Sequence, residues 1–235
     1  MELEGFDTRV ALVTGAARGI GRRTAETLRD LGARVAVGDL KAPAIDGVLG
    51  VEMDVTDEGS VDAAFTRVEQ ELGRVDILVV NAGIFVIEPF EETSLASWRT
   101  TIDVNLTGAF LTARRAVGGM REAGYGRILM IGSSAGKTGG AKSMAAYGAS
   151  KAGVMTLAKS IASEYARDGI TSNALAPSLI DTDMISSMPD LHERVPVGRL
   201  GTVDDVASLI GFLCSEHAGY ITGEVVDING GFLID

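Results

Sequence analysis

Short apolar runs alternate along the chain with longer segments in which apolar residues recur at helical spacing. Most of the short runs lack strict apolar/polar alternation, as is typical of strands buried on both faces. The pattern predicts strands at 10–14, 35–39, 50–54, 76–81, 127–133, 170–176 and 224–228, and helices at 19–31, 58–72, 95–121, 148–167 and 203–216. This alternation predicts an α/β fold: a Rossmann-type doubly wound parallel sheet of about seven strands flanked by helices on both faces.

The alternation runs without a linker, low-complexity stretch or repeat, so residues 1–235 are predicted to form a single domain. One connection departs from the pattern. The segment 40–49 is too short for a full crossover helix, and Pro43 weakens a helix there further.

Composition and charge narrow the class of protein. The net charge of −11 argues against binding to nucleic acid or to an anionic membrane. No apolar run approaches the roughly 18 residues that span a bilayer, and the first residues lack the basic start of a signal peptide. Cys214 is the only cysteine, which makes a reducing, cytoplasmic setting the simplest expectation. His192 and His217 lack partners at metal-ligand spacing, so no metal site is expected.

A glycine-rich turn, VTGAARGIG, lies between the first predicted strand and the first predicted helix. Its Gly15, Gly19 and Gly21 would let backbone N–H groups point at a dinucleotide pyrophosphate with no side chain in the way. An ordinary glycine-rich turn is the alternative, but the position directly after the opening strand favours a cofactor site.

Two aspartates end predicted strands beside this turn. Asp39 could accept hydrogen bonds from the adenosine ribose and repel a 2′-phosphate, which favours NAD over NADP, or it could cap the turn. Arg18, Arg22 and Lys41 could neutralise a phosphate, so NADP stays possible. Asp54 could hold the adenine amino group or cap the helix that begins near residue 58.

The stretch YGASK places Tyr147 and Lys151 on one face of a helix. A nearby ammonium favours the phenolate, so the pKa of Tyr147 is expected to fall, as a general acid/base requires. A partly buried tyrosine beside a solvated lysine is the alternative. Ser133 ends a predicted strand, where its hydroxyl could donate to a substrate carbonyl oxygen. Asn105 lies within a predicted helix, either holding a water or simply exposed or capping.

Taken in order, these motifs resemble the short-chain dehydrogenase/reductase family, single-domain type. The resemblance rests on TGAARGIG, Asp39, Asp54-Val55, NAG at 81–83, Asn105, the Ser133 region, YGASK, NALAPSLIDT and the C-terminal segment that begins GRLGTVDDVASL. It covers essentially the whole chain. It implies an NAD(P)-dependent oxidoreductase that transfers hydride reversibly between a nicotinamide, with NAD favoured, and a secondary alcohol or ketone.

The resemblance also implies roles for single residues. Tyr147 would be the general acid/base, Ser133 would polarise the carbonyl, Lys151 would lower the phenol pKa and bind the nicotinamide ribose, and Asn105 would hold a relay water. The residues expected along the dinucleotide are Gly15, Arg18, Gly19, Ile20, Gly21, Asp39, Asp54, Val55, Asn81, Ala82, Gly83, Tyr147, Lys151, Pro177, Ile180 and Thr182.

Three features depart from the family pattern. Ser178 stands where the family usually has glycine. Ser133 lies 14 residues before Tyr147, one more than expected, so Ser134 remains an alternative for the catalytic serine. Residues 183–195 form an unusually short substrate lid, which suggests an open pocket.

Within the enzyme class, the alternative is a 3-oxoacyl-(acyl-carrier-protein) reductase that uses NADPH. The motif pattern suits it, and a cluster of arginines could dock an acidic carrier protein, but Asp39 and the net charge argue against it. The cluster comprises Arg114, Arg115, Arg121 and Arg127. A regulator that binds a dinucleotide without turnover is disfavoured because Tyr147 and Lys151 are both present. The resemblance implies a homotetramer, with helices 95–121 and 148–167 paired across a two-fold axis.

Overall fold

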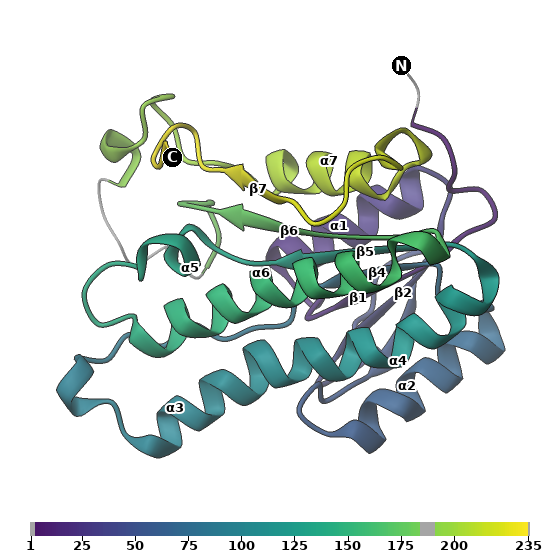
Figure 1. The fold of residues 1–235 in the computed structure, drawn as a ribbon, viewed down its shortest axis with the longest axis horizontal. Coiled ribbons are helices and arrows are strands. Elements are labelled where there is room, and N and C mark those ends of the chain that lie inside the picture. Colours follow the sequence, from purple (N-terminus) through teal and green to yellow (C-terminus); the bar gives the residue numbers. More distant parts are fainter. Residues whose placement is uncertain (1–2, 184–190, 235) are drawn as a thin grey trace.

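The computed structural model describes residues 3–183 and 191–234, and its strands form one parallel sheet (Figure 1). The strands are β1 (Val10–Thr14), β2 (Arg34–Asp39), β3 (Leu49–Glu52), β4 (Ile77–Val80), β5 (Gly126–Ile131), β6 (Ile170–Pro177) and β7 (Val225–Ile228). Their order across the sheet is β3-β2-β1-β4-β5-β6-β7. The predicted Rossmann-type fold is confirmed. The order reverses between β1 and β4, and ligands of such sheets bind at the carboxyl ends beside that point.

Helices cover both faces of the sheet (Figure 1). The main helices are α1 (Gly19–Asp30), α2 (Glu58–Glu71), α3 (Leu95–Ile102), α4 (Gly108–Ala123), α5 (Ser134–Thr138), α6 (Ala145–Tyr165) and α7 (Val203–Cys214). In β1, Val10 and Leu12 pack toward α2, α4 and α6, whereas Ala11 and Val13 pack toward α1 and α7. Both faces of each central strand are thus buried, which explains the continuous apolar runs. Across residues 3–183 and 191–234, no helix has the length and apolar character needed to cross a bilayer.

The structure changes several predicted boundaries. The helix predicted over 95–121 is α3 and α4 joined by a π-helical turn, Asp103–Thr107. The short α5 was not predicted, nor were the 3₁₀ turns, because such short pieces leave little periodicity to detect. These turns are Phe90–Glu92, Ala166–Asp168, Leu191–Arg194 and Glu216–Ala218.

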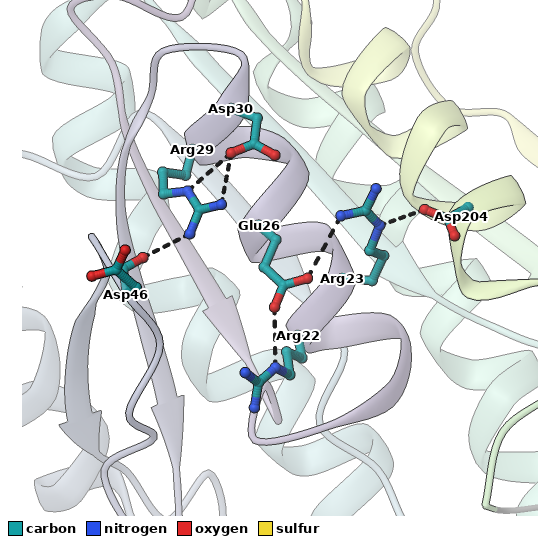
Figure 2. Close-up of polar contacts among 7 residues, drawn as sticks. All are labelled: Arg22, Arg23, Glu26, Arg29, Asp30, Asp46 and Asp204. Atoms are coloured by element: carbon teal, nitrogen blue, oxygen red, sulfur yellow. Dashed lines mark hydrogen bonds and ion pairs between the residues drawn. The ribbon is translucent and has the colours of Figure 1, made fainter.

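The connection between β2 and β3 contains no helix, as predicted, and α1 holds it in place. Arg29, near the end of α1, donates a hydrogen bond to the backbone carbonyl of Asp46 at 2.7 Å (Figure 2). Arg23 ties the same helix to α7 through an ion pair with Asp204 and also contacts Glu26 (Figure 2). The helix that follows the glycine-rich turn is therefore fixed to its neighbours on two sides.

Candidate active site

The turn between β1 and α1 is closed by direct backbone packing. Gly15 has a left-handed backbone (φ +65°), and a Cβ there would lie 2.6 Å from the Cα of Ala82. A Cβ on Gly21 would lie 2.5 Å from Nδ2 of Asn81. Both contacts are shorter than any side chain tolerates, so these two glycines let the turn lie against the end of β4.

Gly19 differs from these two glycines because the space over it is open. Its backbone is also left-handed (φ +58°), but a Cβ there would meet only Cγ2 of Thr182, at 4.0 Å. Arg18, the N-cap residue of α1, makes no side-chain capping bond, so no capping side chain occupies the N–H groups of the first turn. An open space in front of helical N–H groups suits an anion. The turn therefore fits a pyrophosphate.

The residues NAG at 81–83 brace this turn from the end of β4. Asn81 Nδ2 donates to the carbonyl oxygens of Thr14 (3.0 Å) and Gly15 (2.8 Å). The backbone N–H groups of Asn81 and Ala82 both donate to Oγ1 of Thr14, at 3.1 Å each. The structure thus brings Asn81 and Ala82 to the predicted cradle. Thr14 was missed, although a polar residue that ends an apolar strand was a detectable signal.

Asp39 lies beside the glycine-rich turn at the end of β2. Its Oδ2 accepts from the backbone N–H of Ala17 at 3.0 Å, and its Oδ1 accepts from that of Leu40 at 2.8 Å. The carboxylate therefore joins the turn to β2, and each oxygen retains a lone pair for a further donor. Such a group suits the hydroxyls of an adenosine ribose.

The three cations that could neutralise a 2′-phosphate lie in different surroundings. Arg22 pairs with Glu26 at 3.1 Å (Figure 2). Arg18 lies 3.7 Å from Asp183, and both side chains are largely exposed. Lys41 is exposed on the segment that follows β2. Two of the three cations, Arg18 and Arg22, thus already lie next to a carboxylate.

Asp54 and Val55 follow β3. Oδ1 of Asp54 accepts from the backbone N–H of Thr56 (2.9 Å) and from its hydroxyl (2.7 Å). The capping role considered for Asp54 is wrong, because the N-cap of α2 is Asp57, whose side chain accepts from the N–H of Gly59. The side chain of Val55 is buried in the core beneath α4.

Tyr147 and Ser133 meet at the other end of the site. Tyr147 lies in the first turn of α6 with a side chain only 9% exposed, and Phe85 packs edge-on against its ring with 4.8 Å between centroids. Ser133 is the N-cap of α5. Its Oγ accepts from the N–H of Ala135 at 3.1 Å, and its hydroxyl forms a hydrogen bond with the Tyr147 phenol. The hydroxyl pair is therefore formed by Ser133, not by Ser134.

The expected lowering of the Tyr147 pKa is wrong for this geometry. Burial raises the pKa of the phenol above its ordinary value, and the hydrogen bond from Ser133 offsets part of that rise. The physical reason is desolvation, because a phenolate loses its hydration in this nearly closed position. The Lys151 ammonium, 5.9 Å from the ring centroid, does not reverse the effect.

Lys151 lies deep between α6 and β5. It is 5% exposed, and its Nζ donates to the carbonyl oxygen of Ile131 at 2.7 Å. Burial lowers the pKa of this amine to about 8. A Cβ on Gly83 would lie 3.4 Å from Nζ, so the amine faces the end of β4. An ammonium has three N–H donors, and those not used by Ile131 suit the hydroxyls of a nicotinamide ribose.

Asn105 occupies the π-helical turn and is only 1% exposed. Its Oδ1 accepts from the N–H of Ile84 at 2.8 Å, and its Nδ2 donates to the Ile84 carbonyl (3.0 Å) and to Oγ of Ser150 (2.9 Å). The exposed or capping alternative for Asn105 is therefore wrong. Ser150 in turn donates to the Tyr147 carbonyl at 2.7 Å, which connects Asn105 to α6. π-Helical turns are frequent at functional sites.

A cavity of about 490 Å³ lies beside the side chains described above for the two ends of the site. Tyr147, Ser133 and Lys151 line it. The other predicted residues in its wall are Ile20, Asn81, Gly83, Pro177, Ile180 and Thr182. Wall residues that sequence reasoning did not assign include Phe85, Thr138, Met144, Leu179, Arg194, Phe232 and Leu233. Residues 184–190 of the predicted lid lie outside the described residues.

Comparison with known proteins agrees with this arrangement. A family model described as "Enoyl-(Acyl carrier protein) reductase" matches residues 15–233. The chain is 40% identical over 245 residues to cis-4-hydroxycyclohexanecarboxylate dehydrogenase of Sinomonas cyclohexanicum, covering 97% of this chain and 98% of that protein. The chain belongs to the short-chain dehydrogenase/reductase family.

Two further members of this family show the same extent of likeness. MabA of Mycobacterium tuberculosis (strain ATCC 25618 / H37Rv), a 3-oxoacyl-(acyl-carrier-protein) reductase, is 42% identical over 235 residues, which cover 96% of this chain and 93% of MabA. The crystal structure of gox2181 superposes with a TM-score of 0.91 at 37% identity, covering 97% of this chain and 96% of that one. As a short-chain dehydrogenase/reductase, the chain is an NAD(P)-dependent oxidoreductase that acts on CH–OH groups.

Proposed function

We propose that this enzyme interconverts a small secondary alcohol and its ketone, that it prefers NAD, and that Tyr147 is its general acid/base. The observation that supports this most directly is the Tyr147–Ser133 hydroxyl pair, which lies in the wall of a cavity that also contains the Lys151 amine. The open space over Gly19 and the carboxylate of Asp39 fit the other parts of a dinucleotide.

In the reducing direction, Tyr147 donates its proton to the carbonyl oxygen of the substrate. Ser133 donates a second hydrogen bond to the same oxygen and stabilises the negative charge that develops there. The raised pKa of the phenol keeps Tyr147 protonated at neutral pH, which suits a proton donor. The nicotinamide cofactor, when bound, would supply or accept the hydride.

Lys151 and Asn105 would assist the Tyr147–Ser133 pair, Lys151 by binding the cofactor and Asn105 in proton transfer. Lys151 would bind the nicotinamide ribose through the N–H donors that Ile131 leaves free. Both N–H groups of the Asn105 amide donate to Ile84 and Ser150, whereas its Oδ1 accepts only from the N–H of Ile84 and keeps a lone pair with which it would hold a proton-relay water.

The preference for NAD rests on Asp39. Its carboxylate already accepts from two backbone N–H groups beside the turn, and a 2′-phosphate placed next to it would meet a fixed negative charge. Arg22, which could offset that charge, is paired with Glu26.

The second candidate is the 3-oxoacyl-(acyl-carrier-protein) reductase activity for which MabA is named. Identity of 42% favours it, but the arginine cluster offers a carrier protein little free charge. Arg114 pairs with Glu58, and Arg115 pairs with Asp62 and Glu69. Arg127, also in the cluster, is buried, so that Arg121 is the member whose charge lies exposed without an ion pair among the described residues.

Initial rates on two substrates with two cofactors separate these candidates. Oxidation of cis-4-hydroxycyclohexanecarboxylate, the alcohol in the name of the Sinomonas relative, is measured with NAD and NADP. Reduction of acetoacetyl coenzyme A is measured with NADH and NADPH. The first candidate predicts higher turnover with the NAD pair and activity on the free alcohol. Turnover restricted to the thioester and NADPH would establish the second candidate instead.

We also propose a cytoplasmic homotetramer. Apolar side chains are exposed on one side of the molecule, on the 3₁₀ turn Phe90–Glu92 and helices α3 and α4. They are Phe90, Leu95, Trp98 and Phe110. Burial between subunits would remove this surface from water. Light scattering that gave the mass of one chain would contradict the assembly.

A further inference from the structure

The charged side chains that the described residues contribute to the cavity wall are all positive. Although the chain carries a net charge of −11, two cations, Lys151 and Arg194, line the cavity, and no carboxylate from the described ranges 3–183 and 191–234 does so. Lys151 is buried and bonded to Ile131, whereas Arg194 is exposed. A cation in the wall of a mainly apolar cavity is a recognition element for a ligand of opposite charge.

Arg194 is fixed in place by the C-terminal turn. Its guanidinium carbon lies 5.3 Å from the centroid of the Phe232 ring, in a cation–π contact. Both residues line the cavity. The backbone N–H of Val197 donates to the carbonyl of Gly230 at 3.1 Å, and Val195 packs so closely that a Cβ on Gly230 would lie 2.6 Å from it. The segment that carries Arg194 is therefore attached to the segment that carries Phe232.

The guanidinium of Arg194 has no carboxylate partner within the described part of the chain. Most other arginines near the site do have one: Arg22 pairs with Glu26, and Arg199 pairs with Asp205. A planar guanidinium held against an aromatic ring presents its N–H edge in the geometry that matches a carboxylate.

Apolar side chains make up much of the rest of the cavity wall, with the hydroxyls of Ser134, Thr138 and Ser178 among them. Phe85, Met144, Phe232 and Leu233 supply apolar surface there, and Tyr147 and Ser133 supply the hydroxyls of the reactive pair. The wall thus offers a reactive pair, a mainly apolar middle and a cation.

We propose that Arg194 binds a carboxylate on the substrate, so that the preferred substrates of this enzyme are oxo acids and the corresponding hydroxy acids with an apolar body. This inference rests on the proposed function, because it places the reacting carbonyl at Tyr147. Arg194 acts in substrate specificity and takes no part in the proton transfer.

Matched pairs of an oxo acid and its methyl ester test the assignment. The probes are 3-oxobutanoate, 4-oxopentanoate and 4-oxocyclohexanecarboxylate, each with its methyl ester and each reduced with NADH. Wild-type enzyme should prefer the acid in at least one pair. Arg194→Gln should raise KM for that acid by about tenfold or more, because it removes a charged hydrogen bond. Its kcat, its KM for the ester and its dissociation constant for NADH should stay near the wild-type values.

Two further variants exclude a general effect of charge or folding. Arg194→Lys keeps the charge but loses the paired N–H edge, so the KM for the acid should fall between those of wild type and Arg194→Gln. Arg199→Gln removes a nearby positive charge outside the cavity wall and leaves the Thr202–Asp205 capping box intact, so it should behave as wild type.

The opposite results would overturn the assignment. Equal losses on acid and ester, a weaker binding of NADH by Arg194→Gln, or a wild-type enzyme that reduces only esters would each show that Arg194 does not bind a substrate carboxylate. An enzyme that binds NADH but reduces neither member of any pair would also count against it. Failure to bind NADH at all is a separate outcome, which would overturn the proposed function itself.

Discussion

The two ends of the site are built in different ways. At the cofactor end, the turn from Gly15 to Gly21 is one continuous stretch, to which Asn81 donates hydrogen bonds and from which Asp39 accepts one. At the substrate end, the wall comes from the loop after β4, α6, the segment around Arg194 and the C-terminal turn. The turn at the cofactor end is therefore encoded by one motif, although Asp39 and Asn81 brace it from the ends of β2 and β4. The substrate end exists only after distant segments have packed together.

The largest expected effect is at the junction of the two ends. Tyr147→Phe removes the hydroxyl that bonds to Ser133 but leaves the ring, which packs against Phe85. Turnover should fall by about a thousandfold, the usual contribution of a positioned acid/base. The NADH dissociation constant, measured by fluorescence titration, should hardly change. A variant that kept a tenth of the wild-type kcat would show that another group transfers the proton.

The next expected effect distinguishes two glycines of the cofactor end, Gly19 and Gly15. Gly19→Ala places a methyl group in the open space over α1, so it should weaken NADH binding by about a hundredfold at a cost of only about 1 kcal/mol in stability from its left-handed backbone. Gly15→Ala places the methyl group against the backbone of Ala82 and should destabilise the fold distinctly more.

Titration of NADH and urea denaturation of both glycine variants supply the measurements. If Gly19→Ala bound NADH as tightly as wild type, the phosphates would not lie over that residue, and the cradle would have to be placed elsewhere.

The same contrast explains what the sequence could and could not predict. The positions of the strands follow from short buried runs, and the cradle, Asp39 and the YGASK pair lie in compact motifs. The π-helical turn at Asn105 has no separate sequence period. Arg194 and Phe232 are 38 residues apart, and their contact forms only once the segment around Val195 packs against the turn at Gly230. The direction of the Tyr147 pKa was missed because spacing reveals the neighbour of a group, whereas burial depends on the finished fold.

The burial of Lys151 should make the free energy of unfolding depend on pH. Its pKa is about 8 in the folded protein and near 10.5 when unfolded. Between these values the unfolded chain binds more protons, so this group makes the free energy of unfolding rise with pH from about 8 to 10.5. Relative to Lys151→Met, which lacks the titration, wild type should gain about 2 kcal/mol between pH 7 and 10.

Urea denaturation of both proteins at a series of pH values measures this gain, and taking the difference between the two proteins cancels the other titrating groups. A difference that stayed constant with pH would mean that Lys151 keeps its ordinary pKa and is better hydrated than its 5% exposure indicates.

The smallest expected effect tests whether Asp39, beside the glycine-rich turn, sets the preference for NADH over NADPH. Asp39→Ser removes the carboxylate but keeps an oxygen that can accept from Ala17 or Leu40. The ratio of kcat/KM for NADH to that for NADPH should fall by about tenfold, because the fixed charge next to the 2′-phosphate is lost. Asp30→Ser removes a carboxylate at the far end of α1, where it pairs with Arg29, and should leave the ratio unchanged.

If both variants shifted the ratio equally, selectivity would arise from the overall negative charge of the protein. If neither did, the ribose would lie out of reach of Asp39, and the specificity of this enzyme would be set, like its substrate end, by residues that its motifs do not contain.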